Sequence, residues 1–401
     1  MRTGELQWVI NRQARNTQDK KANPGFLSTD EIDQARSFHR KFESYQPTPC
    51  ISLDQLAAYL GVDKLWVKDE SYRFGLNAFK VLGASYAIGK FLANKLNTDI
   101  KELSFERLKS KETRDKLGEI TFTTATDGNH GRAVAWAARE LGQKAVVYMP
   151  KGSSQERLNA ILATGAEASI TDLNYDDAVR LAAENAEKFG WHVIQDTAWE
   201  GYEEVPGWIM QGYGTIGAEV QEQLKEQGIE KPTHIILQAG VGSFAGAIQG
   251  YYAALFGEDR PITIILEPEK AACIYKSAQI GNGKPHAVTG DLNTIMAGLA
   301  CGEPNPIGWE ILRDYSDAYF SCCDYIAEKG IRVLANPLPG DMKIISGESG
   351  AVGIGLMNML REDQRYEHLL EALKITKDAR ILVISTEGDT DPESYRRILW
   401  G

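Results

Sequence analysis

The sequence has few cysteines, no ligand-type histidine spacing and no long apolar run. Its 401 residues include five cysteines and six histidines. The cysteines lack CxxC spacing and the histidines lack HExxH spacing, so neither a metal site nor a disulfide framework is indicated. Residues 1–21 have polar residues throughout and lack the apolar core of a signal peptide, and no later stretch reaches the length of a membrane span. We therefore expect a cytoplasmic protein with no metal ion and no membrane partner.

Positive charge is also in short supply. The chain has 44 Lys and Arg against 55 Asp and Glu, a formal net charge of -11. A field of this sign repels phosphate backbones, which argues against a nucleic-acid partner and favours a small-molecule ligand. The 43% hydrophobic content is that of an ordinary globular protein, and this length predicts two domains around a shared cleft.

Apolar runs, Gly-rich turns and amphipathic helices alternate from Glu119 onward, which predicts parallel α/β sheets flanked by helices. We predict two open twisted sheets, one in a small domain over residues 90–200 and one in a large domain made of 1–89 and 201–401. The expected strands are 119–126, 144–150, 191–196, 233–240, 262–269 and 381–388. The expected helices are 128–141, 154–164, 175–189, about 213–227, 242–256 and one more at the end of the chain.

The segment from Asn282 to Asn305 is rich in Gly, Pro and Asn. Loops of this length in compact domains are usually functional, so we expect it over the cleft or at its edge. Cys273 and Cys301 flank the Gly-rich part of this region. They are either two buried thiols, the simpler interpretation, or a redox-linked pair, which we hold as a hypothesis.

The first candidate site segment runs from Ser71 to Lys80, a turn leading into a helix expected to begin near Ala78. An amine in the first turn of a helix lies at the positive end of the macrodipole. This position disfavours the protonated form and makes the amine a better nucleophile toward a carbonyl. A solvent-exposed lysine is the ordinary alternative. Lys80 therefore becomes a candidate Schiff-base lysine only in combination with the other segments.

The second segment, Thr124 to Gly131, closes a strand and opens a helix. Its glycines allow the backbone to approach a planar ligand, and Asn129 can donate to a phenolate oxygen. The alternative is a bare turn in which Asp127 caps the helix.

The third segment, Gln238 to Gly246, joins a strand to a helix. Gly240, Val241, Gly242 and Ser243 expose successive N–H groups that suit a phosphate. The pattern is GxGxxxG rather than the GxGxxG of a dinucleotide site, so a dehydrogenase ranks second.

The fourth segment, Ser385 to Asp391, ends a strand. The hydroxyl of Ser385 or Thr386 could hydrogen-bond a pyridine nitrogen, whereas the carboxylates could be ordinary turn residues.

Together these segments resemble the fold type II pyridoxal-phosphate-dependent enzymes, and most closely the diaminopropionate ammonia-lyases. The similarity covers most of the chain. It rests on NAFKVLGASYA, TDGNHGRAVAWAA, QDTAWEGYEEVPGWIMQGYGT, QAGVGSFAGA, MAGLACGEPN, SGESGAVG and STEGDTD.

The resemblance implies that Lys80 holds pyridoxal 5'-phosphate, that Asn129 contacts its phenolate oxygen and that Gly240 to Ser243 bind its phosphate. Ser385 or Thr386 would meet the ring nitrogen. It also implies a homodimer with the cofactor in the cleft between the domains. The stretch Tyr72 to Leu76 departs from the SxKxR and HSFK forms of other relatives, which weakens a cysteine synthase or threonine dehydratase assignment.

The implied reaction is the elimination of the β-amino group of 2,3-diaminopropionate, giving pyruvate and two ammonia. Lys80 would be the general base. Asp127 and Asp196 both follow strands, and a carboxylate beside the departing ammonium would keep it protonated. We hypothesise that Asp127 acts on the D form and Lys80 on the L form. The role of Glu348 is open.

Two other functions stay in view. One is a serine or threonine dehydratase or a β-replacement synthase with the same cofactor. The other, of a different class, is a binding or regulatory protein that keeps the fold without the chemistry.

Overall fold

The computed structural model describes residues 5–16, 22–126 and 128–401. Within them, seven strands form one sheet whose five inner strands are parallel and whose two edge strands, β1 and β2, are antiparallel. In spatial order the strands are β1 (Gln7–Ile10), β10 (Ala318–Cys322), β9 (Ile262–Pro268), β8 (His234–Gln238), β11 (Arg380–Ser385), β3 (Lys64–Asp69) and β2 (Cys50–Ser52).

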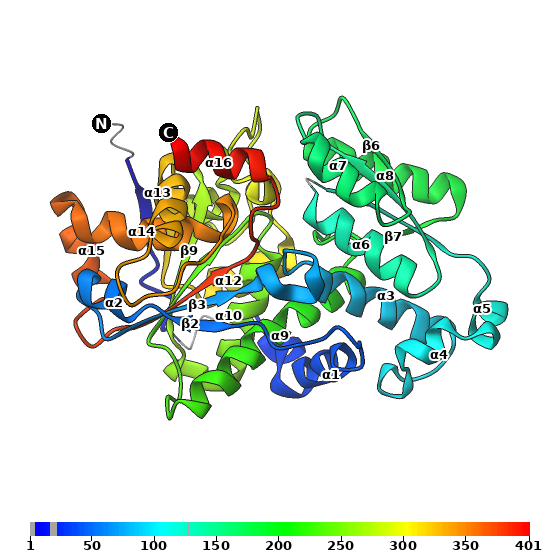
Figure 1. Ribbon diagram of the computed structural model, residues 1–401, viewed down its shortest axis with the longest axis horizontal. Coiled ribbons are helices and arrows are strands. Elements are labelled where there is room, and N and C mark those ends of the chain that lie inside the picture. The colour runs from blue at the N-terminus through cyan, green and yellow to red at the C-terminus, as the bar shows by residue number, and fades with distance from the viewer. Residues whose placement is uncertain (1–4, 17–21, 127) are drawn as a thin grey trace.

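A second sheet of four parallel strands lies in the other lobe of the molecule (Figure 1). Its order is β6 (Glu167–Ile170), β5 (Lys144–Met149), β4 (Thr121–Ala125) and β7 (His192–Val193). Parallel strands need helical crossovers that cover the sheet faces. The two-sheet α/β class predicted from the sequence is therefore confirmed.

The helices fall into two groups, which Figure 1 shows around the two sheets. Around the larger sheet lie α1 (Thr29–His39), α2 (Asp54–Leu60), α9 (Glu204–Glu226), α10 (Ser243–Phe256), α11 (Cys273–Ile280), α12 (Pro306–Tyr315), α13 (Asp324–Ala335), α14 (Glu348–Glu362), α15 (Glu367–Ala372) and α16 (Pro392–Trp400). The other lobe contains α4 (Phe105–Lys109), α5 (Lys111–Leu117), α6 (Asn129–Glu140), α7 (Gln155–Leu162) and α8 (Tyr175–Phe189), and α3 (Val81–Lys95) lies between the two groups. Because α3 packs on both α9 and α6, it joins the two lobes.

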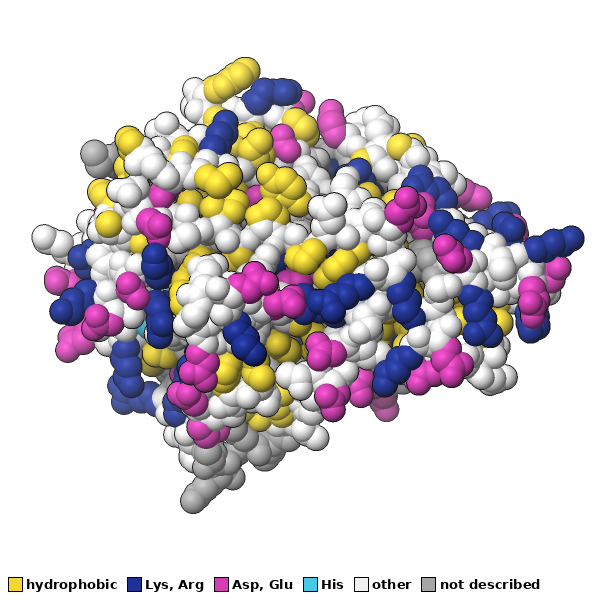
Figure 2. Space-filling model, turned by 60° about the horizontal axis from the view of Figure 1, so that its bottom comes forward, with side chains coloured by type: hydrophobic (Ala, Val, Ile, Leu, Met, Phe, Trp, Pro, Cys, Tyr) yellow, Lys and Arg dark blue, Asp and Glu magenta, His cyan; other side chains and the backbone are white. Residues whose placement is uncertain are grey.

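Short 3-10 turns occupy several connections between these elements. They are Pro24–Leu27, Glu70–Gly75, Ile100–Glu102, Gly257–Asp259, Glu269–Ala271, Ala297–Leu299 and Gln364–Tyr366. Within the described ranges, every helix is too short or too polar to cross a membrane. Figure 2 shows acidic and basic side chains intermixed over one face, so on that face the negative charge is not gathered into one patch.

Helix α9 begins at Glu204, earlier than the expected start near Tyr213. The glycines of its first turns are typical of a loop, but here they permit close packing of two helices. A Cβ on Gly212 would lie 2.4 Å from the carbonyl oxygen of Leu82 on α3. The start near Tyr213 was therefore wrong, because the need for a small residue at a helix contact outweighs helix propensity.

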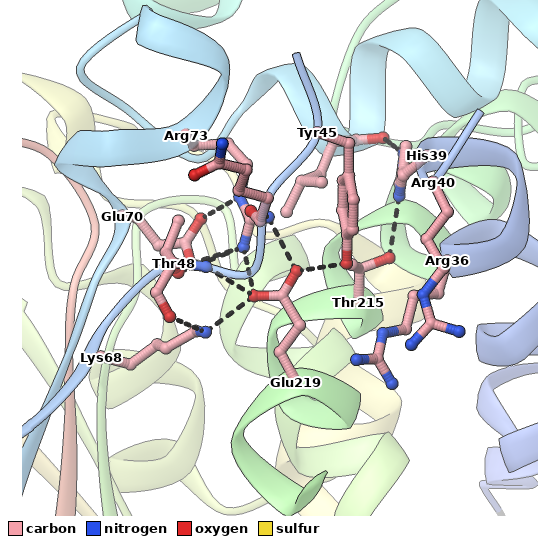
Figure 3. A network of polar contacts seen from close by, with 12 residues as sticks. Arg36, His39, Arg40, Tyr45, Thr48, Lys68, Glu70, Arg73, Thr215 and Glu219 are labelled. Atoms are coloured by element: carbon pink, nitrogen blue, oxygen red, sulfur yellow. Dashed lines mark hydrogen bonds and ion pairs between the residues drawn. The ribbon is translucent and has the colours of Figure 1, made fainter. Parts of the chain in front are cut away.

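A buried cluster of four charged side chains supports the turn that precedes α3 (Figure 3). Glu219 on α9 accepts a hydrogen bond from Lys68 on β3 at 2.7 Å and two from Arg73 at 2.8 Å. Arg73 also pairs with Glu70 at 2.8 Å. Two cations thus balance two carboxylates, which satisfies the requirement that buried charges be paired.

Candidate active site

The predicted site segments meet at one cavity between the two lobes. They come from the start of α3, the start of α6, the residues after β7, the turn from β8 to α10 and the end of β11. Ligands of open α/β sheets bind at such carboxyl ends of strands. The cavity is lined by Phe79, Lys80, Asn129, Asp196, Tyr213, Gln238, Gly240, Val241, Gly242, Ser243, Phe244, Gly298, Leu299, Cys301, Ser349, Thr386 and Glu387.

Lys80 lies at the N-cap of α3 and points into this cavity, and its side chain is only 15% exposed. The expected helix start near Ala78 was wrong by a few residues. Asn77 has a φ of 57°, and Ala78 makes a bridge to Glu387, so the chain enters the helix only after Lys80. The lysine amine is nevertheless at the positive end of the helix dipole.

Asp196 forms an ion pair with Lys80, with 2.7 Å between Oδ2 and Nζ. His130 Nδ1 lies 4.0 Å from the same carboxylate oxygen. Burial by itself would raise the pKa of Asp196, but the charges of Lys80 and His130 outweigh it and hold this pKa well below its usual range. Asp196 is therefore an ionised carboxylate next to the lysine amine.

The turn from Gly240 to Ser243 forms the N-terminus of α10. Gly242 has a φ of 97°, a conformation that favours glycine, and Ser243 begins the helix. The Ser243 hydroxyl donates to the backbone carbonyl of Asp196 and accepts a hydrogen bond from Asn305 Nδ2 at 2.6 Å. The glycine turn thus presents a helix N-terminus to the cavity, an arrangement suited to an anion.

Asn129 is the first residue of α6, and the preceding Gly128 has a φ of 147°. The Asn129 side-chain amide donates to the carboxylate of Glu387, which follows β11. Glu387 is 2% exposed, although the sequence offered a solvated turn as an explanation for it. Glu387 belongs to the STEGDTD motif, and this motif was the feature of the sequence that could have indicated a role for Glu387 at the site.

Thr386 lines the cavity, but Ser385 does not. The Ser385 hydroxyl donates to Ser346 Oγ at 2.7 Å, away from the cavity. Thr386 Oγ1 accepts from Gln238 Nε2 at 2.9 Å, which orients this hydroxyl at the rim of the cavity. Of the two candidates for the ring nitrogen, the geometry brings only Thr386 to the site.

The remaining sequence expectations fall outside the site or at its edge. Asp127 lies outside the described residues. Glu348 does not line the cavity, and burial, with the nearby charge of Glu387, raises its pKa. Cys273 and Cys301 are buried cysteines that are not joined by a disulfide in the structure.

The loop that follows Asn282 lines the site, as expected. Gly298 and Cys301 border both the site and an adjoining cavity of about 600 Å³, which Lys80 also lines. Asn305, at the end of this loop, was not predicted to be a site residue. It reaches Ser243 through a contact 62 residues away in sequence, which no local pattern reveals.

These residues fit pyridoxal phosphate. A lysine amine faces the cavity, a helix N-terminus offers N–H groups to a phosphate, and a hydroxyl borders the rim. Within the described part of the chain, Gln238 Oε1 and Ser349 Oγ are buried at this cavity without a hydrogen-bond partner. Buried polar atoms normally have partners, so these two are suited to contact a bound polar group.

Comparison with known proteins leads to the same class. The profile of the family "Pyridoxal-phosphate dependent enzyme" matches residues 42–387, and this is the class that the fold and the cavity define. The diaminopropionate ammonia-lyase of Escherichia coli (strain K12) is 54% identical over 375 residues, which cover 93% of this chain and 92% of that protein.

Two solved structures of the Escherichia coli enzyme superimpose closely on this chain, and each match covers 99% of this chain and 97% of theirs. The complex with D-serine gives a TM-score of 0.92 at 50% identity. The complex with an aminoacrylate-PLP azomethine reaction intermediate gives 0.90, also at 50% identity. The chain belongs to the diaminopropionate ammonia-lyases, and its cofactor is pyridoxal phosphate.

Proposed function

We propose that this chain eliminates the β-amino group of 2,3-diaminopropionate in both its D and L forms, producing pyruvate and two ammonia. The observation that carries the proposal is the ion pair of Lys80 and Asp196 inside the cavity that also contains the glycine turn. The substrate differs from serine by an ammonium group, and an ionised carboxylate at the site is complementary to that group. The named function of the Escherichia coli relative supports the same substrate.

Each side chain has a task in this proposal. Lys80 holds the cofactor through its amine and, once released, removes the Cα proton of the L form. Pyridoxal phosphate, when bound, supplies the electron sink for the Cα carbanion. Gly240, Val241, Gly242 and Ser243 hold its phosphate, Asn129 its phenolate oxygen and Thr386 its ring nitrogen.

Asp196 acts on the leaving group. Because Lys80 and His130 keep its pKa low, the Asp196 carboxylate is ionised at neutral pH and attracts the β-ammonium of the substrate. An ammonium is a far better leaving group than a free amine, so a contact that favours the protonated form promotes elimination. The enamine product takes up water and releases the second ammonia, which leaves pyruvate.

Stereochemistry supplies a separate test. We propose that Asp127, which follows a strand in the sequence, removes the Cα proton of the D form from the face opposite Lys80. The variant Asp127→Asn is expected to lose turnover of D-diaminopropionate while keeping much of the turnover of the L form. An equal loss for both enantiomers would contradict this assignment.

The decisive measurement for the substrate is the ratio of ammonia to pyruvate. The holoenzyme is incubated separately with D-diaminopropionate, L-diaminopropionate, D-serine and L-serine, and both products are quantified. Diaminopropionate should give two ammonia per pyruvate with the highest kcat/KM. Absence of pyruvate from either diaminopropionate enantiomer would reject the proposal.

A serine dehydratase is the second candidate, because the Escherichia coli relative has been solved in complex with D-serine. The same experiment separates the two functions, since serine yields one ammonia per pyruvate. A kcat/KM for serine above that for diaminopropionate would make this the principal activity.

We also propose that the enzyme works as a cytoplasmic homodimer, with residues 90–200 as the small domain and residues 1–89 and 201–401 as the large one. Family membership supports the dimer, and the four-stranded sheet, which falls within 121–193, agrees with the small domain. Light scattering would measure the mass in solution, cell fractionation the location and limited proteolysis the boundaries.

A further inference from the structure

Glu387 is a buried carboxylate that the proposed reaction leaves without a task. It follows β11 of the larger sheet, and its side-chain partner Asn129 begins α6 of the other lobe, 258 residues away in sequence. Both residues line the cavity. The contact therefore crosses between the lobes at the site itself.

Two further donors hold this carboxylate. Ser349 donates its backbone N–H to Oε1 at 3.3 Å, and the Thr390 hydroxyl donates to Oε2 at 3.2 Å. Over the described residues, Glu387 makes no ion pair with a Lys, Arg or His side chain. Its negative charge is thus met by hydrogen-bond donors, of which the Asn129 amide faces the cavity.

The chemistry of the two side chains fixes their orientation. An ionised carboxylate only accepts hydrogen bonds, whereas an Asn amide has one accepting oxygen and two N–H groups on its nitrogen. Glu387 therefore selects the nitrogen end of the Asn129 amide. The second N–H on that nitrogen stays available for another acceptor in the cavity.

We propose that Glu387 is a positioning residue that acts through Asn129. It turns the Asn129 amide so that its second N–H meets the phenolate oxygen of the cofactor, and its charge strengthens that N–H as a donor. The inference rests on the proposed function, because it assigns the phenolate contact to Asn129. Glu387 itself touches neither substrate nor cofactor in this scheme.

The test is a double-mutant cycle on the cofactor-binding step. Apoprotein of the wild type, Glu387→Ala, Asn129→Ala and the double variant is titrated with pyridoxal phosphate, following the visible absorption band and its affinity. We expect each single variant to weaken binding about ten-fold and to shift the band, because each loses the same oriented hydrogen bond. The double variant should bind no more weakly than Asn129→Ala alone.

Glu348→Gln is the matched control. It replaces a second carboxyl group that is 3% exposed, close to the 2% of Glu387, and Glu348 has no contact with Asn129 among the described residues. Its band should stay at the wild-type wavelength. Glu387→Gln keeps the shape of the side chain and guards against misfolding of the alanine variant. It should shift the band because its amide can face Asn129 with either end.

The outcomes separate the inference from the function on which it rests. If Asn129→Ala weakens binding and Glu387→Ala does not, or if the two losses multiply in the double variant, the positioning role is refuted. If Asn129→Ala binds and absorbs like the wild type, the assignment of Asn129 to the cofactor fails, and this inference fails with it. A band shift in Glu348→Gln equal to that of Glu387→Gln would also overturn the inference, since the change of any nearby carboxyl group would then shift the band.

Discussion

Two lysine–carboxylate pairs in this molecule have the same length and different surroundings. Lys68 and Glu219 approach to 2.7 Å with both side chains 0% exposed. Lys80 and Asp196 also approach to 2.7 Å, with side chains 15% and 5% exposed. The first pair belongs to the four-charge cluster of Figure 3, and the second faces the cavity.

The difference lies in how many partners each carboxylate has. Glu219 accepts from Lys68, Arg73, Tyr45 and the Thr48 backbone, so its position is fixed from several directions. Asp196 accepts hydrogen bonds from the Lys80 amine at 2.7 Å and from the Tyr175 hydroxyl at 3.4 Å, and that amine can be engaged by a carbonyl cofactor. The distance between the charged atoms therefore does not distinguish an ion pair with a structural role from one that takes part in the reaction. Access to a cavity and the number of hydrogen-bond partners do distinguish them.

The largest expected effect is on catalysis. Lys80→Ala should lower kcat/KM for diaminopropionate by at least about a thousand-fold, because the attachment point of the cofactor and the general base are lost together. The measurement is pyruvate formation with excess pyridoxal phosphate. Retention of a tenth of the wild-type rate would mean that another group does this chemistry.

Lys68→Ala should act on stability instead. Removing one partner of a buried ion pair leaves an uncompensated charge, so the free energy of unfolding should fall by about 3–5 kcal/mol. Urea unfolding of the apoprotein, compared with Lys80→Ala, measures this. Equal destabilisation by the two variants would remove the distinction between the pairs.

The free energy of unfolding at acidic pH should depend on the ionisation of Glu219. Burial alone would raise its pKa, but Arg73 and Lys68 outweigh burial and hold this pKa well below its usual value of 4.5. The unfolded chain then takes up the proton first. Stabilisation by this carboxylate is thus present above pH 4.5 and is lost as the pH falls toward the folded-state pKa.

The variant Glu219→Gln should therefore lose less unfolding free energy than the wild type between about pH 5 and about pH 3.5. Its stability at neutral pH should already be lower. If the unfolding free energies of the two proteins changed in parallel with pH, Glu219 would not have a depressed pKa in the folded state.

The smallest effect on stability is expected from an exposed ion pair. Lys109 lies 2.8 Å from Glu140, with side chains 48% and 27% exposed. Lys109→Ala should change the free energy of unfolding by less than about 1 kcal/mol, since water screens such pairs. A loss of unfolding free energy as large as that of Lys68→Ala would show that burial does not determine how much an ion pair contributes to stability.

The sequence predicted the part of the site that is built from local junctions. Lys80, Asn129, Asp196 and the turn at Gly240 each stand where a strand or turn meets a helix, and parallel strands bring such junctions to one edge of a sheet. The structure brings all four to one cavity.

The parts that could not be predicted depend on distant partners. From the sequence, Glu387 is an ordinary turn carboxylate and Asn305 an ordinary loop residue. Only the structure shows that Glu387 contacts Asn129 and that Asn305 contacts Ser243. Strand β3 was missed because its buried Lys68 interrupts the apolar pattern, and the cation is balanced by Glu219 on a remote helix. Strands β1, β2, β6 and β10 were also not predicted.

The most direct test of the account is to locate the lysine that holds the cofactor. The holoenzyme is reduced with borohydride, digested and mapped by mass spectrometry for the pyridoxyl group. We expect the modification on Lys80 and on no part of the peptide that contains Lys68. Modification of another lysine, or of none in protein saturated with pyridoxal phosphate, would contradict it.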